Sequence, residues 1–181
     1  MRLLVLSDTH GLVQQAMEVY RIEEEKAHID AIVHLGDLKS DAKALSTRLG
    51  VPVSNVPGNC DGSASREDEA VLKTPWGNIL LAHGHLEDVD YGLEKLSWRA
   101  GEMECKAAFF GHTHRPLYRW EHGMYFLNPG SLTRPRGGNE GSYAVAEATP
   151  DGFSATVLFY TPRPKVTSGV LYHLLNNSDR A

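Results

Sequence analysis

The sequence predicts an α/β fold in which residues 1–181 form one domain. In the first part of the chain, near-continuous apolar runs alternate with polar segments of helical periodicity. Such runs are typical of strands that are buried on both faces of a sheet. The last part reads instead as consecutive short strands separated by turns. We therefore expect sheets that are partly parallel and partly antiparallel.

In the first part, each expected strand is followed by polar residues that start a turn or a helix. The first strand leads into a segment with the apolar spacing of an amphipathic helix, and the second leads into a segment that reads as a short helix. The third strand ends in a tight turn that contains two glycines and a proline. The expected strands are residues 2–6, 31–35 and 51–56, the helices are residues 12–26 and 40–49, and the turn is residues 57–62.

In the second part, two strands flank the hairpin turn at residues 74–77, and a helix of imperfect periodicity precedes a short buried strand. After it the pattern changes to strands joined by turns. Residues 161–181 have a mixed composition that fits either a strand or a short helix. The expected strands are residues 70–72, 78–82, 107–110, 117–121, 124–127, 142–148 and 153–160, and the helix is residues 90–103.

Composition excludes several classes of function. The net charge is −5, from 18 Lys and Arg against 23 Asp and Glu, which argues against a nucleic acid or an anionic membrane recognised by bulk charge. It leaves room for a small anionic substrate held by a metal. Two cysteines are too few for a disulfide framework, no signal peptide is visible, and no apolar stretch could span a bilayer. We expect a cytoplasmic protein.

The strongest functional signal is a pair of histidines after the buried strand at residues 107–110. Gly111 ends the strand, and His112 and His114 follow at spacing i, i+2. In extended backbone this spacing directs both imidazoles to the same side, where they could bind a metal. Two solvated loop histidines are the alternative for this pair taken alone.

The same pattern recurs at four earlier strands, each of which is followed by side chains that can bind a metal. Each has an ordinary explanation, since Asp and Asn are common helix caps and turn formers. Five ordinary explanations in succession are jointly improbable, and sites in open α/β sheets form at the carboxyl ends of strands. The candidates are Asp8 and His10, then Asp37, Asn59 and His83.

These seven nitrogen and oxygen donors, without a thiolate-rich cluster, suit two hard or borderline divalent cations. Asp37 is the natural bridge, because a carboxylate can join two ions and this one stands alone between the other groups. A dinuclear site clamps a phosphoryl group and lowers the pKa of a water, which supplies a nucleophile. The donor set therefore predicts metal-dependent hydrolysis of a phosphoester.

The ordered motifs D-x-H, G-D, G-N-C-D, H-G-H and G-H-T-H resemble those of the calcineurin-like metallophosphoesterase superfamily. The Gly-Asn-Cys-Asp variant and the small size are similar to its YfcE-like phosphodiesterase branch. The resemblance covers residues 3 to about 160. It implies a four-layer αββα sandwich of two sheets and a phosphodiesterase that uses a water or hydroxide activated by two metal ions.

The resemblance also assigns the ligands and suggests the metal. Manganese is the expected cofactor, with Fe, Ni, Zn and Co as alternatives. We expect a small phosphoester as substrate and leave a homo-oligomer open. The resemblance implies that Asp8, His10 and His114 bind the first ion, that Asn59, His83 and His112 bind the second, and that Asp37 bridges them.

The sequence departs from the superfamily pattern at Cys60, where many members have a histidine proposed to protonate the leaving group. A thiol is a poor acid at neutral pH, so the proton could instead come from water, Asp61 or His85. Cys60 could also simply pack behind the site. Besides Asn59, we consider Arg136 a candidate substrate ligand that could hold a phosphate oxygen, with a solvated loop arginine as the alternative.

Two other readings of the same motifs remain. A phosphomonoesterase or protein phosphatase is the nearer one, although the chain lacks long insertions that would build an extended substrate groove. A non-catalytic scaffold resembling a retromer subunit is the other, and the complete ligand set argues against it. The remaining histidines, including His34, match no motif and need only ordinary core or surface roles.

Overall fold

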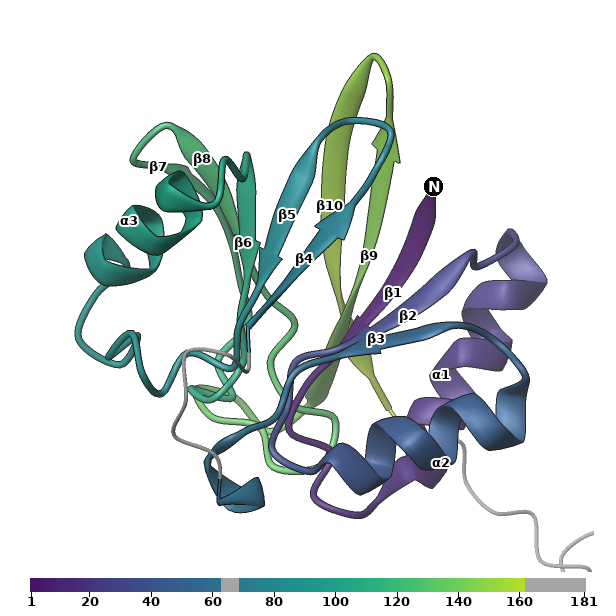
Figure 1. Cartoon of the computed structure of the whole chain (residues 1–181). Helices are drawn as coiled ribbons and strands as arrows, with labels where there is room; N and C mark the ends of the chain where they lie inside the picture. Colours follow the sequence, from purple (N-terminus) through teal and green to yellow (C-terminus); the bar gives the residue numbers. More distant parts are fainter. Residues whose placement is uncertain (63–68, 162–181) are drawn as a thin grey trace, which may run out of the picture.

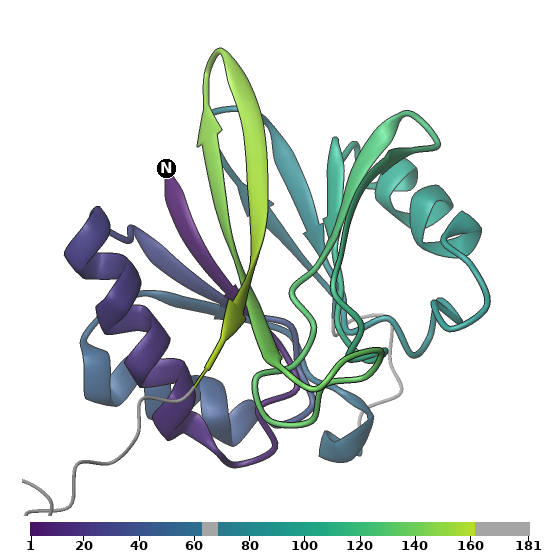
Figure 2. The ribbon, with the colours of Figure 1, turned by 180° about the vertical axis from the view of Figure 1, so that it is seen from behind.

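The computed structural model describes residues 1–62 and 69–161 and contains two mixed five-stranded sheets that pack face to face (Figure 1). Helices cover the outer faces, so the layers run helix, sheet, sheet, helix. This confirms the predicted α/β sandwich. Both views show the long β9–β10 hairpin rising beyond the other strands, at the end opposite most of the connecting loops (Figures 1 and 2).

The first sheet has a parallel half and an antiparallel half. Its strand order is β10-β9-β1-β2-β3, in which β1, β2 and β3 run parallel and β9 runs antiparallel to both β1 and β10. The parallel half places three strand ends at one edge of the molecule. The strands are β1 (Arg2–Leu6), β2 (Ala31–His34), β3 (Val53–Asn55), β9 (Gly141–Thr149) and β10 (Gly152–Tyr160).

The second sheet has three parallel strands in its centre and an antiparallel strand at each edge. Its order is β4-β5-β6-β8-β7, with β5, β6 and β8 parallel. The carboxyl ends of the central strands lie near those of the first sheet (Figure 1). The strands are β4 (Ala70–Lys73), β5 (Asn78–Leu81), β6 (Ala107–Phe109), β7 (Leu117–Glu121) and β8 (Met124–Asn128).

Three apolar cores join the four layers. The first lies between the first sheet and its two helices, α1 (Val13–Lys26) and α2 (Lys39–Leu49). The second fills the space between the sheets, and the third lies between the second sheet and α3 (Glu94–Glu102). Because β1 contributes to the first two cores, its side chains alternate between them, which explains its continuous apolar sequence.

Two expected elements differ from the structure. The helix predicted over residues 90–103 begins only at Glu94, and residues 90–93 belong to the connection that precedes it. The tight turn predicted at residues 57–62 contains a short 3₁₀ helix, η1 (Asn59–Asp61). The uncertain stretch at residues 161–181 lies outside the described residues apart from Thr161. Among the described residues, no helix has the length and apolar character needed to cross a membrane.

Candidate metal centre

The carboxyl ends of parallel strands in both sheets converge, and the predicted ligands lie in the loops that follow them. Asp8 and His10 follow β1, Asp37 follows β2, and Asn59 begins η1 after β3. His83 follows β5, and the histidine pair follows β6. These side chains surround a pocket of about 430 Å³, with His83 buried beneath it. The pocket is lined by Asp8, His10, Asp37, Asn59, Cys60, His112, His114, Arg134, Pro135 and Arg136.

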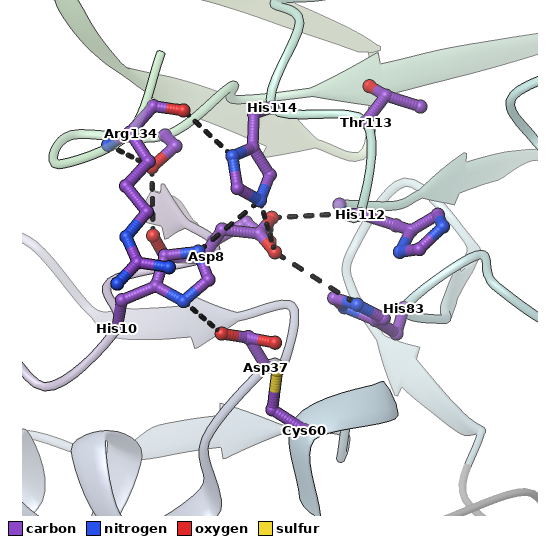
Figure 3. Close-up of polar contacts among 12 residues, drawn as sticks. Asp8, His10, Asp37, Cys60, His83, His112, Thr113, His114 and Arg134 are labelled. Atoms are coloured by element: carbon purple, nitrogen blue, oxygen red, sulfur yellow. Dashed lines mark hydrogen bonds and ion pairs between the residues drawn. The ribbon is translucent and has the colours of Figure 1, made fainter. Parts of the chain in front are cut away.

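The three side chains predicted to bind the first metal lie together (Figure 3). The Nε2 atoms of His10 and His114 are 3.3 Å apart, and His114 Nε2 lies 3.3 Å from Asp8 Oδ1. One potential ligand atom from each of the three residues falls within 4.8 Å of the others. This arrangement suits one cation.

The three side chains predicted to bind the second metal also converge. His83 Nε2 and His112 Nδ1 lie 2.9 Å and 3.2 Å from the same atom, Asn59 Oδ1. An amide oxygen and two imidazole nitrogens at these separations form a second donor set beside the first. Asn59 therefore reaches the second cluster from η1.

Two carboxylates lie between the clusters. Asp37 Oδ2 is 2.5 Å from His10 Nδ1, and Asp37 also forms a group with Asp8 and His83 whose ligand atoms lie within 4.8 Å of one another. Asp8 Oδ1 is 4.0 Å from His83 Nε2. Asp37 therefore contacts the first cluster and lies close to His83 of the second, as expected of a bridging ligand. Asp8, a member of the first cluster, also lies near His83.

Backbone carbonyls fix the orientation of two of the histidines. Nδ1 of His83 lies 2.7 Å from the carbonyl oxygen of Leu35, and Nδ1 of His114 lies 2.7 Å from that of Arg134. Because a carbonyl only accepts hydrogen bonds, Nδ1 donates its proton in both rings, and a neutral ring then has its lone pair on Nε2. In both residues Nε2 is the atom that faces the cluster, as metal binding requires.

Hydrogen bonds also fix the orientation of the Asp8 carboxylate. Its Oδ2 accepts hydrogen bonds from the Ser7 hydroxyl at 2.6 Å and from the backbone N–H of His112 at 3.0 Å, which leaves Oδ1 directed at the histidines. This close approach requires glycine at position 111, since a Cβ there would lie 2.0 Å from Ser7 Oγ. The glycine two residues after β6 therefore lets the loop pack against Asp8.

The backbone is strained at most of the candidate ligands. Among the described non-glycine residues, eight have positive φ angles, and five of these are candidate ligands. A non-glycine residue in this region costs about 1–3 kcal/mol and persists only where the surroundings enforce it, often at functional sites. The five φ angles are 52° at Asp8, 47° at His10, 85° at Asp37, 64° at His112 and 56° at His114.

Burial and charge favour the protonation states that bind metal at His83, His10 and Asp8, whereas His114 is shifted toward its protonated form. Burial lowers the pKa of His83 and of His10, which favours the neutral imidazole. Burial would raise the pKa of the Asp8 carboxyl, but the hydrogen bond with His114 and the charge of His83 lower it overall. The same hydrogen bond to Asp8 raises the pKa of His114. A cation bound to His114 Nε2 would replace the proton on that atom and would interact with the same Asp8 carboxylate.

A segment after β8 braces the loops that hold the ligands. The fully buried Asn128 donates from Nδ2 to the Gly111 carbonyl at 2.8 Å and to Thr113 Oγ1 at 3.1 Å. The buried Ser131 hydroxyl donates to the Asp8 carbonyl at 2.8 Å. The sequence shows this segment as an ordinary Asn-Pro-Gly-Ser turn, so its bracing role was not predicted.

A second brace lies beneath the first metal cluster. His34 Nε2 is 2.9 Å from Thr9 Oγ1, and Thr9 Oγ1 donates to Asp41 Oδ2 at 2.6 Å. Asp41 Oδ2 also accepts the backbone N–H of Gly11 at 2.7 Å. His34 and Thr9 are completely buried. The core role expected for His34 is thus combined with support of the loop between Asp8 and His10.

Comparison with known proteins identifies the family of the chain. Residues 1–151 match the family model described as the calcineurin-like phosphoesterase superfamily domain. The chain therefore belongs to this superfamily. It is 32% identical to the probable metallophosphoesterase YsnB of Bacillus subtilis, over 88% of this chain and 90% of that protein. It is 27% identical to phosphodiesterase YfcE of Escherichia coli, over 81% of this chain and 88% of that protein.

Comparison with solved structures shows the same fold. A predicted phosphoesterase of Streptococcus pneumoniae superposes with a TM-score of 0.72 at 31% identity, covering 91% of this chain and 93% of its own. Vps29 of Entamoeba histolytica in complex with zinc superposes with a TM-score of 0.65 at 22% identity, covering 89% of this chain and all of its own, and shares the fold.

The other candidate residues of this calcineurin-like phosphoesterase lie in two different places. Cys60 is exposed and lines the pocket beside Asp37, and a hydrogen bond to that carboxylate raises the pKa of the thiol to about 11. His85 is outside the residues that line the pocket, and its ring centroid lies 5.3 Å from that of His83 and 6.1 Å from that of His112. Arg136 lines the pocket.

Arg134 lines the pocket together with Arg136, the candidate substrate ligand. The Arg134 carbonyl accepts from His114 Nδ1, and the Arg136 backbone N–H donates to the His114 carbonyl at 3.0 Å. These two hydrogen bonds, one from the His114 side chain and one to its backbone, fix the segment against the first cluster. Figure 3 shows the Arg134 side chain beside His10. In the described part of the chain, neither guanidinium forms an ion pair with a carboxylate.

Proposed function

We propose that this calcineurin-like phosphoesterase is a phosphodiesterase that acts at a dinuclear metal site. The observation that supports the proposal best is the pair of donor clusters with Asp37 between them and with ligand atoms already directed at each other. The donors are imidazole nitrogens and carboxylate or amide oxygens, which suit divalent cations such as Mn²⁺. Backbone strain at five of the candidates supports a functional purpose.

The geometry and the superfamily motifs both support the assignment of ligands that we propose. Two bound cations would supply positive charge for the phosphoryl oxygens and a hydroxide source near neutral pH. The residues proposed to hold the first are Asp8, His10 and His114. Those proposed for the second are Asn59, His83 and His112, with Asp37 between them.

The chain's own residues would position the substrate. Arg134 and Arg136 line the same pocket as the clusters and have no carboxylate partner among the described residues, so their guanidinium groups can each hold a phosphate oxygen. The Asn59 amide also lines the pocket and could donate to the phosphate. These groups would orient the phosphorus for attack by water and for cleavage of the bond to the leaving oxygen.

Cys60 sets the expected choice of leaving group. It lies at the position where many members of the superfamily have a histidine. The hydrogen bond to Asp37 raises the pKa of its thiol, so the thiol stays protonated at neutral pH. Such a thiol is a weak proton donor to a departing oxygen. We therefore propose that the enzyme favours diesters whose leaving group departs without a proton, or that water supplies it.

A matched pair of substrates tests this function. Bis(p-nitrophenyl) phosphate and p-nitrophenyl phosphate share one leaving group, so their kcat/KM values compare diester and monoester directly. Chelator-treated protein should be inactive on both, Mn²⁺ should restore activity, and the diester should be preferred. The His83→Ala variant should lose this activity, while His28→Ala, which removes an exposed histidine at the end of α1, should keep it.

Three outcomes would contradict the proposal. Full activity after verified metal removal would exclude the dinuclear mechanism. A clear preference for the monoester would replace the diesterase with a phosphomonoesterase on the same site. Absence of turnover on every diester and monoester with each of Mn²⁺, Zn²⁺, Co²⁺ and Ni²⁺ would favour the non-catalytic reading.

A further inference from the structure

The connection between β5 and α3 places a carboxylate against one of the candidate ligands. Asp90 Oδ2 lies 3.2 Å from His112 Nε2. On the other side of the ring, His112 Nδ1 lies 3.2 Å from Asn59 Oδ1, in the second cluster. We propose that Asp90 is a positioning residue that fixes the tautomer of His112 and thereby completes the second metal site. The proposal rests on the dinuclear site proposed above.

The tautomer follows from hydrogen-bond chemistry. An ionised carboxylate only accepts hydrogen bonds, so Asp90 requires a proton on His112 Nε2. In the neutral ring the lone pair then lies on Nδ1, the atom that faces Asn59. His83 and His114 show the opposite arrangement, with Nδ1 bound to a carbonyl and Nε2 facing the centre. Each of these three rings is therefore anchored through the nitrogen that points away from the metal centre.

Asp90 differs from the other two anchors in being a side chain. The carbonyls of Leu35 and Arg134 belong to the backbone and survive any substitution. The anchor of His112 is instead encoded by one residue and carries a charge, which also makes the imidazole a better donor to a cation. His112 is therefore the candidate ligand whose orientation can be altered without changing a ligand or a core residue.

Buried neighbours hold Asp90 in place. Val89 and Leu93 on either side of it are buried in the third core, and Val89 N–H donates to the Gly84 carbonyl at 3.3 Å. Tyr91 N–H donates to the Asp88 carbonyl at 2.9 Å, which closes a turn around Asp90. The delayed start of α3 keeps residue 90 outside the helix, within reach of His112.

The same turn offers a matched control. The side chains of Asp88 and Asp90 are each 49% exposed, so substitution of either should leave the core intact. Asp88 pairs with Lys95 rather than with a candidate ligand. It has a φ angle of 53°, a conformation that Asn tolerates well. Asp88→Asn therefore removes one charge from this turn without touching the metal centre.

The first measurement is ¹⁵N NMR of the histidines in metal-free protein above pH 8. In the wild type, His112 should carry its proton on Nε2, as should the Asp88→Asn variant. Asp90→Ala should shift His112 toward a mixture of both tautomers. A wild-type ring protonated on Nδ1, or a ring unaffected by Asp90→Ala, would overturn the proposal. This test does not depend on whether the enzyme prefers diesters or turns over any substrate.

The second measurement is calorimetric titration with Mn²⁺. Loss of such an outer partner typically weakens metal binding 10–100-fold. Asp90→Ala should therefore weaken the second ion at least about 10-fold and leave the first unchanged. Asp90→Asn keeps an oxygen acceptor and should recover most of the affinity, and Asp88→Asn should match the wild type. Equal losses in Asp90→Asn and Asp90→Ala would show that charge alone acts and would refute the positioning role.

Discussion

Substitution of Asn128 tests whether the segment after β8 supports the metal centre. Its side chain is fully buried and makes three hydrogen bonds, to the Gly111 carbonyl, to Thr113 Oγ1 and from the Gly130 N–H. At about 1 kcal/mol for each bond, Asn128→Ala should lower the free energy of unfolding by about 3 kcal/mol. The three hydrogen bonds do not contribute equally to this loss of stability. The Gly111 carbonyl still accepts a hydrogen bond from the Thr113 N–H, whereas the Gly130 N–H loses its side-chain acceptor.

The assay is urea unfolding of the metal-free protein, so that metal affinity does not contribute to the measured stability. Asn55→Ala is the control, because Asn55 lies exposed in β3, and it should change the stability by less than about 0.5 kcal/mol. The metal affinity of Asn128→Ala should also fall, since Gly111 and Thr113 flank His112. A loss below about 1 kcal/mol with unchanged metal affinity would refute the bracing role.

Three further predictions follow from the candidate site and the core. Asp37→Asn should lower the content of both metals after purification, and two ions per chain with normal turnover would contradict its bridging role. Cys60→His should accelerate diesters with alkyl leaving groups more than nitrophenyl diesters, as measured in a leaving-group series, and equal effects would mean that the side chain only packs. Burial would raise the pKa of Glu23, but hydrogen bonds from Lys26 and Tyr143 lower it below 4.5, so the stability that Glu23 contributes is present above that pH and lost below it. Urea unfolding at pH 7 and pH 4 should show a smaller pH dependence in Glu23→Gln, and an unchanged one would contradict this reasoning.

The sequence was sufficient to single out the candidate ligands because their signal is local. Each follows a strand whose burial is visible in its own apolar run, as with Asp8 after β1 and His83 after β5. Parallel strands then bring their carboxyl ends to one edge without further information. The chemical types of the residues at those ends were enough to predict two metal ions. The proposed ligands and the fold therefore follow from patterns that are a few residues long.

The supports of the site could not be predicted in this way, because they depend on contacts between distant segments. Ser131 reaches Asp8 across 123 positions, and nothing in a Pro-Gly-Ser turn indicates that contact. Asp90 was placed in a helix because Tyr91 and Leu93 have a helical spacing with later apolar residues. In the structure Asp90 lies in a turn and contacts His112, and that contact depends on the assembly of the second sheet.

The strained candidate ligands and the distant residues that brace them reflect one energetic requirement. Five backbone conformations that each cost about 1–3 kcal/mol would relax unless surrounding bonds held them. Asn128, Ser131 and the Thr9 network supply those bonds from residues that would touch neither metal nor substrate. A site assembled in this way has its donors oriented by the fold, so binding energy is not spent on ordering them. His112 is the exception, since its orientation depends on the half-exposed carboxylate of Asp90, and the second metal is therefore the one whose affinity a single surface substitution should change.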